Sequence, residues 1–113
     1  MDRGYAYDQL GDYEQAIADY DRAIELDPSS AKYDTLAMVY FKLEQYDQAM
    51  EHYDLALSLD DKNFYSHKGR GDVYLALDNQ EAALADYEAY LSRAPAGPER
   101  DEVEAIVKFL QAP

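Results

Sequence analysis

The residue types that perform metal and acid-base chemistry occur in this chain, but their spacing does not bring them together. The chain has two histidines and no cysteine, so any zinc site would depend on His52 and His67. Histidines that share a zinc ion on one helix face are usually spaced i, i+4, and neither histidine has such a partner. We expect His52 on a solvated helix face, His67 as a packing residue, and no metal site.

Two further segments have only part of a ligand-binding pattern. Residues 60–63 begin like a calcium loop, but no glycine follows where such a loop must turn sharply. Residues 69–71 form a lone Gly-x-Gly inside a helical pattern with no strand before it, which does not predict a phosphate site. Carboxylates are abundant everywhere, and no pair stands out for acid-base work. The sequence therefore predicts no catalytic residue, no cofactor and no enzyme.

Net charge limits the classes of partner. Ten Lys and Arg residues stand against 24 Asp and Glu residues, which gives a net charge of −14, and residues 1–30 carry the largest share. Such a surface repels phosphate backbones and anionic lipids, so we expect no nucleic-acid or membrane partner. No apolar run approaches the length of a membrane span, and the N-terminus lacks a signal-peptide pattern. The expectation is a soluble protein, cytoplasmic by default, whose acidity either confers solubility or selects a basic partner.

An internal repeat defines the elements that would position any site. Similar segments begin at Leu10, Leu43 and Leu77, which are 33 and then 34 residues apart. The recurring positions are Gly4, Ala37 and Gly71, then Tyr7, Tyr40 and Tyr74, then Ala16, Ala49 and Ala83, then Tyr20, Tyr53 and Tyr87. A fixed period of this length indicates stacked repeats, each of which buries its apolar face against its neighbours.

The pattern of aromatic, Leu-Gly, Tyr, Ala and Pro positions resembles the tetratricopeptide repeat (TPR) over residues 1–95. The departures are Arg3 and Arg70 in place of Leu, Asp61 in place of the closing Pro, and Tyr90 in place of a small residue. The first repeat begins inside its first helix, which suggests either a longer parent protein or an atypical start. The resemblance implies an all-α fold, a right-handed helix-turn-helix solenoid of three repeats plus a C-terminal capping helix.

Turn residues and apolar spacing predict the helix boundaries within this single domain. The repeats should occupy residues 1–30, 31–63 and 64–95, with helices at 2–9, 12–26, 31–43, 45–59, 64–76 and 79–92. Gly11-Asp12 should break the first helix pair, and Asp27-Pro28 should end it. After a connector at 96–98, a helix over 99–111 should cover the end of the stack. Its apolar stripe consists of Val103, Ile106, Val107 and Leu110.

The resemblance also implies a concave groove, lined by the first helix of each repeat, that holds a peptide. By alignment this groove would present Tyr5, Asp8, Asp34, Met38, Phe41, Lys42, Tyr65, Lys68, Asp72 and Leu75. Met38 and Phe41 lie off the core-facing stripe of their helix, where a solvated helix normally carries charge. Some TPR proteins clamp the carboxylate tails of heat-shock chaperones with basic residues, but the aligned positions here hold only one cation, Lys68. A basic and apolar segment fits this groove better than an acidic tail.

These observations predict a non-catalytic protein–protein interaction module that binds a protein or peptide partner of basic and apolar character in its concave groove. The alternative is a structural, homo-oligomerising repeat unit of a larger protein. In that case another copy covers the end face that the incomplete first helix exposes. A third hypothesis is that the chain is the regulatory or targeting part of a longer enzyme.

Overall fold

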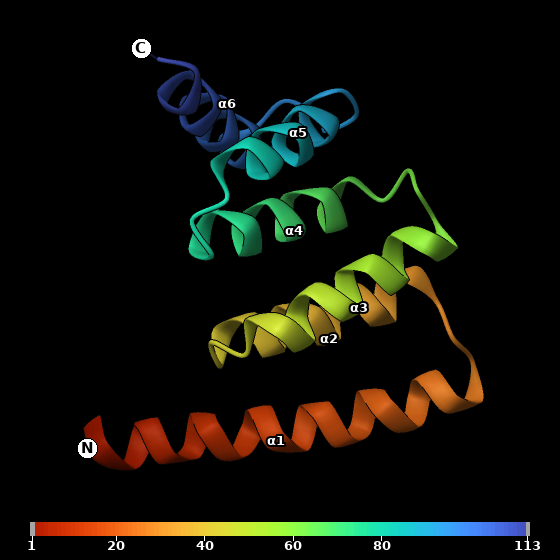
Figure 1. The fold of residues 1–113 in the computed structure, drawn as a ribbon. Helices are drawn as coiled ribbons and strands as arrows, with labels where there is room; N and C mark the ends of the chain where they lie inside the picture. The colour runs from red at the N-terminus through yellow and green to blue at the C-terminus, as the bar shows by residue number, and fades with distance from the viewer. Residues whose placement is uncertain (1, 113) are drawn as a thin grey trace.

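A stack of helices forms the whole of the described chain. The computed structural model describes the backbone of residues 2–112 and side chains from residue 12 to residue 112. The helices are α1 (Asp2–Leu26), α2 (Ser30–Lys42), α3 (Tyr46–Leu59), α4 (Phe64–Ala76), α5 (Gln80–Leu91) and α6 (Pro98–Gln111). They follow one another from α1 at one end of the stack to α6 at the other (Figure 1). Within residues 2–112 there is no strand, so the predicted all-α class is confirmed.

Polar side chains fix where the helices begin. Ser29 accepts a hydrogen bond from the Lys32 amide at the start of α2, and Asn63 does the same for the Ser66 amide at the start of α4. These contacts satisfy backbone donors that have no partner within the helix. At α6, Pro98 occupies the first turn, as predicted, and Gly97 before it has a φ of 157°, which favours glycine.

The turns within repeats two and three use the same backbone device. Glu44 lies between α2 and α3 with a φ of 60°, and Asp78 lies between α4 and α5 with a φ of 62°. One left-handed residue reverses the chain so that the two helices of a repeat pack side by side. The helices of both repeats therefore match the predicted ranges to within one residue.

Repeat one differs, and here the prediction of two helices was wrong. Gly11 occupies the position equivalent to Glu44 and Asp78, yet α1 continues through it as one helix from Asp2 to Leu26 (Figure 1). Glycine permits the left-handed turn but does not require it. The predicted helix over 2–9 would have only about two turns, too short to be stable without strong packing. Continuing α1 keeps its backbone hydrogen bonds. The predicted end of the helix before Asp27-Pro28 is correct.

Small residues and tyrosines make the core between the helices. Ala37, Ala49 and Ala83 are fully buried, which lets paired helices approach closely. A Cβ atom on Gly69 would meet Cζ of Tyr53 at 2.2 Å, and one on Gly71 would meet Cε1 of Tyr87 at 2.9 Å. Both glycines are therefore required for space, because each leaves room for the aromatic ring that packs against it.

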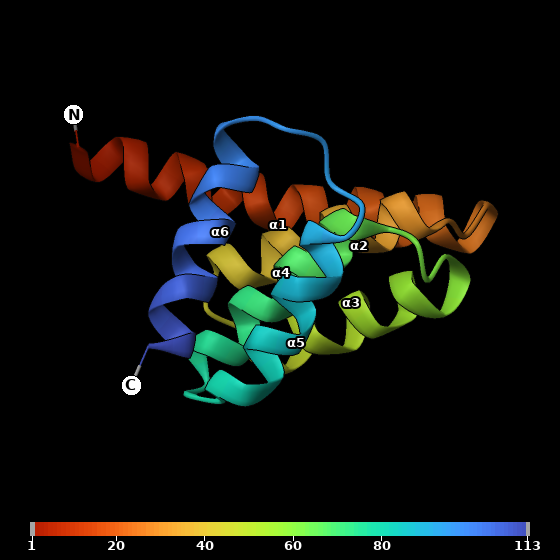
Figure 2. The same ribbon diagram turned by 90° about the horizontal axis from the view of Figure 1, so that it is seen from above.

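Helix α6 covers the last repeat and also presents an apolar face of its own. Val103 and Val107 are buried in the cluster that contains Tyr87 and Tyr90 of α5, and Ile106 and Leu110 are partly buried against it. Figure 2 shows α6 crossing the end of the stack beside α4 and α5. The predicted apolar stripe thus faces the core. Phe109, on another side of α6, is 77% exposed.

Candidate functional site

A small pocket lies where repeat two, repeat three and helix α6 meet, and we call it the acidic pocket. Its volume is about 110 Å³, and it is lined by Asp34, Met38, Tyr53, Tyr65, Lys68, Gly69, Asp72 and Glu99. Helices α2, α3, α4 and α6 each contribute at least one of these residues. The pocket therefore depends on the stacking of the repeats and belongs to no single one of them.

The apolar part of the acidic pocket follows from the packing described above. Because Gly69 has no side chain, the ring of Tyr53 packs against its backbone, and both residues line the pocket. Burial, with smaller contributions from Asp34 and Asp72, raises the pKa of Tyr53, so its phenol stays neutral. Met38 is 44% exposed and Tyr65 is 55% exposed. These two side chains offer apolar contact at the opening of the pocket.

Two carboxylates of the acidic pocket are held in place by neighbouring hydroxyl groups. Asp34 is buried, and the hydroxyl of Ser66 on α4 donates a 2.8 Å hydrogen bond to its Oδ1 atom. Burial raises the pKa of Asp34, against the lowering effect of Ser66. The hydroxyl of Tyr87 donates a 2.6 Å hydrogen bond to Asp72 Oδ1. Both acids are therefore fixed in direction, which favours a ligand that needs defined geometry.

The cation of the acidic pocket already has a partner. Lys68 Nζ lies 3.1 Å from Asp72 Oδ2, one helical turn away. Burial opposes the charge of Lys68, but Asp72, Glu99 and Glu102 outweigh it, so the pKa of Lys68 is raised. Asp34 and Glu99 have no ion pair within the described side chains. The pocket therefore has more negative than positive charge, and its chemistry favours a cationic group beside apolar surface.

The structure brings together five of the ten residues that the sequence placed in the groove. Asp34, Met38, Tyr65, Lys68 and Asp72 all line the acidic pocket.

The other predicted groove residues lie elsewhere. Phe41 is partly buried with its ring centroid 5.6 Å from that of Tyr46, and Lys42 Nζ lies 6.0 Å from the centroid of the Tyr13 ring. Leu75 lines a separate depression with Phe109. Tyr5 and Asp8 belong to α1, but their side chains lie outside the described residues.

Sequence reasoning missed Tyr53, Gly69 and Glu99 as residues that line the acidic pocket. Tyr53 was predicted to fill space between repeats, which it does, but one side of its ring also faces the pocket. Gly69 could have been suspected because it aligns with Thr35 and Asp2, both of which have side chains. For Glu99 there was no signal, because the sequence does not say how α6 is oriented across the stack.

A second group of charges, the ion-pair cluster, consists of Asp54, His67, Arg70 and Asp86. Arg70 donates 2.9 Å hydrogen bonds from Nε and Nη2 to the two oxygens of Asp86, and Nη1 lies 3.0 Å from Asp54. The Asp86 hydrogen bonds, despite burial, raise the pKa of Arg70, so it stays charged. His67 Nδ1 lies 3.1 Å from Asp86. Arg70, which replaces the usual Leu, thus joins α3, α4 and α5.

The two histidines have structural roles. His52 is half-buried, with its ring centroid 5.1 Å from that of Tyr40 and 6.1 Å from that of Tyr33, so the predicted solvated position is only partly correct. His67 packs between helices through the ion-pair cluster, in agreement with its predicted packing role. Among the described residues, no group of three or more acidic or histidine side chains is arranged to hold a metal ion.

Comparison with known families identifies the repeats. The tetratricopeptide repeat family matches residues 1–30, 35–63 and 69–96. These matches cover most of the chain and agree with the internal period and, in repeats two and three, with the helix pairs described above. The chain belongs to the tetratricopeptide repeat family.

Solved structures with the same fold include peptide complexes. The first TPR of Spaghetti (RPAP3), bound to the HSP90 peptide SRMEEVD, is 28% identical with a TM-score of 0.79, and the match covers 98% of this chain and 90% of that one. The second TPR domain of human RPAP3, in complex with the HSP70 peptide SGPTIEEVD, is 26% identical with a TM-score of 0.78, covering 99% and 92%. The Arabidopsis OM64 TPR domain, at 23% identity and a TM-score of 0.80, covers 96% and 90% and shows the shared fold.

Two further searches, one of known proteins and one of the described helices, give negative results. A search of curated protein sequences finds no match to this chain. In the helices that the structure describes, none combines the length and the apolar character needed to cross a membrane.

Proposed function

We propose that this chain is a non-catalytic interaction module that binds a peptide segment of basic and apolar character in the acidic pocket on its concave face. The observation that carries the proposal is the lining of that pocket. Asp34 and Glu99 are free of ion pairs within the described side chains, and Lys68 is already paired with Asp72. Peptide complexes of the two RPAP3 relatives support peptide binding as the mode of action.

The charge of the peptide should differ from that seen in those relatives. Their peptides, SRMEEVD and SGPTIEEVD, end in acidic residues. An acidic tail would meet Asp34, Asp72 and Glu99 here. Repulsion between these like charges disfavours binding of the acidic tail. The net charge of −14 acts in the same direction at longer range.

A matched pair of peptides tests this proposal. Fluorescence anisotropy would compare labelled SRMEEVD with SRMKKVK-amide, in which each acidic residue becomes Lys and the terminal carboxylate is capped. We expect the basic peptide to bind at least tenfold more tightly and to lose affinity as salt rises. Tighter binding of SRMEEVD, or equal affinities, would contradict the proposal.

Variants then locate the binding surface. Glu99→Gln removes one charge from the acidic pocket, whereas Glu51→Gln makes the same change at an exposed position on α3 outside it. We expect only Glu99→Gln to lower the affinity for the basic peptide, by about threefold to tenfold, chiefly through slower association. Met38→Ala should instead speed dissociation, because it removes apolar contact.

Self-association is the second candidate, and one observation favours it. A depression of about 370 Å³ at the end of the stack is lined by Leu75, Ile106, Phe109 and Leu110 with three other residues. The exposed end of a repeat stack is the surface on which a further unit or a second copy can pack. Light scattering on the whole chain, with Phe109→Glu as the variant, tests it. A dimer that Phe109→Glu dissociates would support it, and a monomer at all concentrations would refute it.

A further inference from the structure

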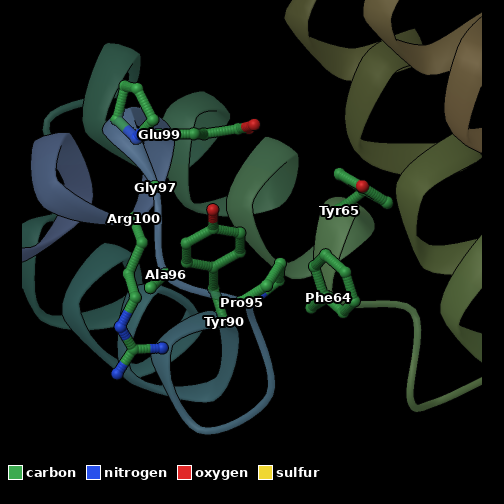
Figure 3. A pocket seen from close by; sticks show the side chains of 9 residues that line it. Phe64, Tyr65, Tyr90, Pro95, Ala96, Gly97, Glu99 and Arg100 are labelled. Atoms are coloured by element: carbon green, nitrogen blue, oxygen red, sulfur yellow. The ribbon is translucent and has the colours of Figure 1, made fainter.

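A larger pocket adjoins the acidic pocket, and we call it the aromatic pocket. Its volume is about 200 Å³, and its lining consists of Phe64, Tyr65, Tyr90, Pro95, Ala96, Gly97, Pro98, Glu99 and Arg100. It is built by the start of α4, the end of α5 and the connector into α6 (Figure 3). This connector lies outside the inner helices that the sequence assigned to the groove.

Rings and prolines make the aromatic pocket mostly apolar. The ring centroid of Phe64 lies 4.4 Å from that of Tyr65 and 5.9 Å from that of Tyr90, in an edge-to-face arrangement with the latter. Tyr90 is only 2% exposed, so packing fixes its ring, and Figure 3 shows this ring between the connector and Phe64. Tyr90 stands where the repeat pattern has a small residue, and its ring helps to form the pocket. A preformed apolar wall of this kind binds side chains at little cost in entropy.

The polar groups of the aromatic pocket disfavour an anionic occupant. Arg100 is its only cation, and its Nη1 atom donates 2.7 Å hydrogen bonds to the carbonyl oxygens of Leu91 and Ala94. Its Nε atom bonds to Glu104. The guanidinium therefore ties the end of α5 to α6 through its Nε and Nη1 atoms, and Figure 3 shows it directed away from Tyr65 and Glu99. Glu99 is the carboxylate that remains at the pocket.

Two residues, Tyr65 and Glu99, line both the acidic pocket and the aromatic pocket. The pockets are therefore neighbours that share a wall. We propose that they form one continuous groove in which the aromatic pocket takes an apolar side chain while the acidic pocket takes the basic side chain of the same peptide. This inference rests on the proposed function. In an extended segment, side chains i and i+2 lie on one face roughly 7 Å apart, so we assign the two side chains to alternate positions.

Three capped peptides test the spacing: GSRSLSG, GSRSASG and GSRLSSG. The first carries Arg and Leu at alternate positions, the second lacks the apolar side chain, and the third has the composition of the first with Leu moved to the opposite face. Titration followed by NMR suits the millimolar affinities expected of such short peptides. We expect GSRSLSG to bind at least fivefold more tightly than either of the others.

One variant fills the aromatic pocket. Ala96 is an exposed connector residue that lines it, so Ala96→Phe places a ring in the space for the peptide side chain. The control Ala85→Phe adds the same ring at an exposed position of α5 outside both pockets. We expect Ala96→Phe to reduce the affinity for GSRSLSG to that for GSRSASG, and Ala85→Phe to leave it unchanged.

The outcomes separate the two proposals. Equal affinities for all three peptides, with sensitivity to Glu99→Gln retained, would overturn the aromatic pocket as a subsite and leave the acidic pocket standing. An equal change in the affinity for GSRSLSG in Ala96→Phe and Ala85→Phe would also overturn the aromatic pocket as a subsite. No binding of any peptide, basic SRMKKVK-amide included, would overturn the proposed function and this inference with it.

Discussion

The acidic pocket and the ion-pair cluster contain the same kinds of residue and differ in how completely their charges are paired. In the ion-pair cluster, Arg70 bonds to both oxygens of Asp86 and reaches Asp54. In the acidic pocket, Lys68 pairs with Asp72 alone. A paired cluster holds helices together, whereas carboxylates without a paired cation favour a partner that supplies one. The net charge of a surface therefore says little about its function until the pairing of its charges is known.

The largest effect on stability is expected for Asp86→Ala, which removes a partner from the ion-pair cluster. Asp86 is 4% exposed, and its loss leaves the guanidinium of Arg70 without its main partner. We expect a loss of about 3 kcal/mol in unfolding free energy, which lowers Tm by on the order of 10 °C. Urea and thermal unfolding followed by circular dichroism measure it. Asp54→Ala is the control, because the side chain of Asp54 is 54% exposed and its loss should cost about 0.5 kcal/mol. Equal losses would contradict the distinction.

Asp34→Asn should have the opposite effect to Asp86→Ala. It should lower the affinity for a basic peptide without lowering the free energy of unfolding. We expect roughly tenfold lower affinity for a basic peptide, or about 1.4 kcal/mol. Because the pKa of Asp34 is raised in the folded state, its contribution to stability is full below pH 3.8 and is lost as pH rises through the raised pKa. Asn does not titrate. The variant should therefore be at least as stable as the parent at pH 7, with an advantage that shrinks toward pH 3. Urea unfolding between pH 3 and pH 7 measures this difference. A variant that is less stable than the parent at pH 7 would contradict the prediction.

Tyr87→Phe tests how the acidic pocket is held in position. The ring stays, but the 2.6 Å hydrogen bond to Asp72 is lost. We expect a cost of about 1 kcal/mol in unfolding free energy. The half-buried Tyr74, on the same helix as Asp72, provides the control Tyr74→Phe, which should cost less. Similar costs for both would mean that the Asp72 contact adds nothing to stability.

Lys42→Ala should have the smallest effect. Lys42 was predicted to line the groove, but it is exposed, with its ammonium near the Tyr13 ring and outside the acidic pocket. An exposed cation–π contact contributes about 0.5 kcal/mol. We expect a stability change no larger than this and an unchanged affinity for SRMKKVK-amide. Weaker peptide binding by the variant would show that Lys42 is part of the binding surface.

The repeat period predicted the fold well because the same physical requirements recur in each unit. Small residues at Ala37, Ala49 and Ala83 and punctuation at Asp27-Pro28 correctly predicted close packing and a helix end. The break at Gly11 was wrong because a glycine allows a turn without enforcing it.

The candidate site was harder to predict than the fold. Alignment to the family identified residues on inner helices, and the five that share the acidic pocket come from α2 and α4. Glu99 and the aromatic pocket depend on how α6 and its connector cross the stack, and no local pattern specifies this. Phe41 and Leu75 do not line the acidic pocket, because a side chain off the core stripe can still pack against its own turn or the next repeat.

The sharing of one pocket among several helices has a consequence for dynamics. Glu99 lies in the first turn of α6, and the terminal helix of a stack is usually the first to open locally. Each time α6 detaches, the acidic pocket loses Glu99 and the aromatic pocket loses Pro98, Glu99 and Arg100. A ligand that binds only the closed form must then lower the population of the open form by mass action. Hydrogen exchange at the amides of α6 would therefore report on ligand occupancy at a distance from the basic side chain itself.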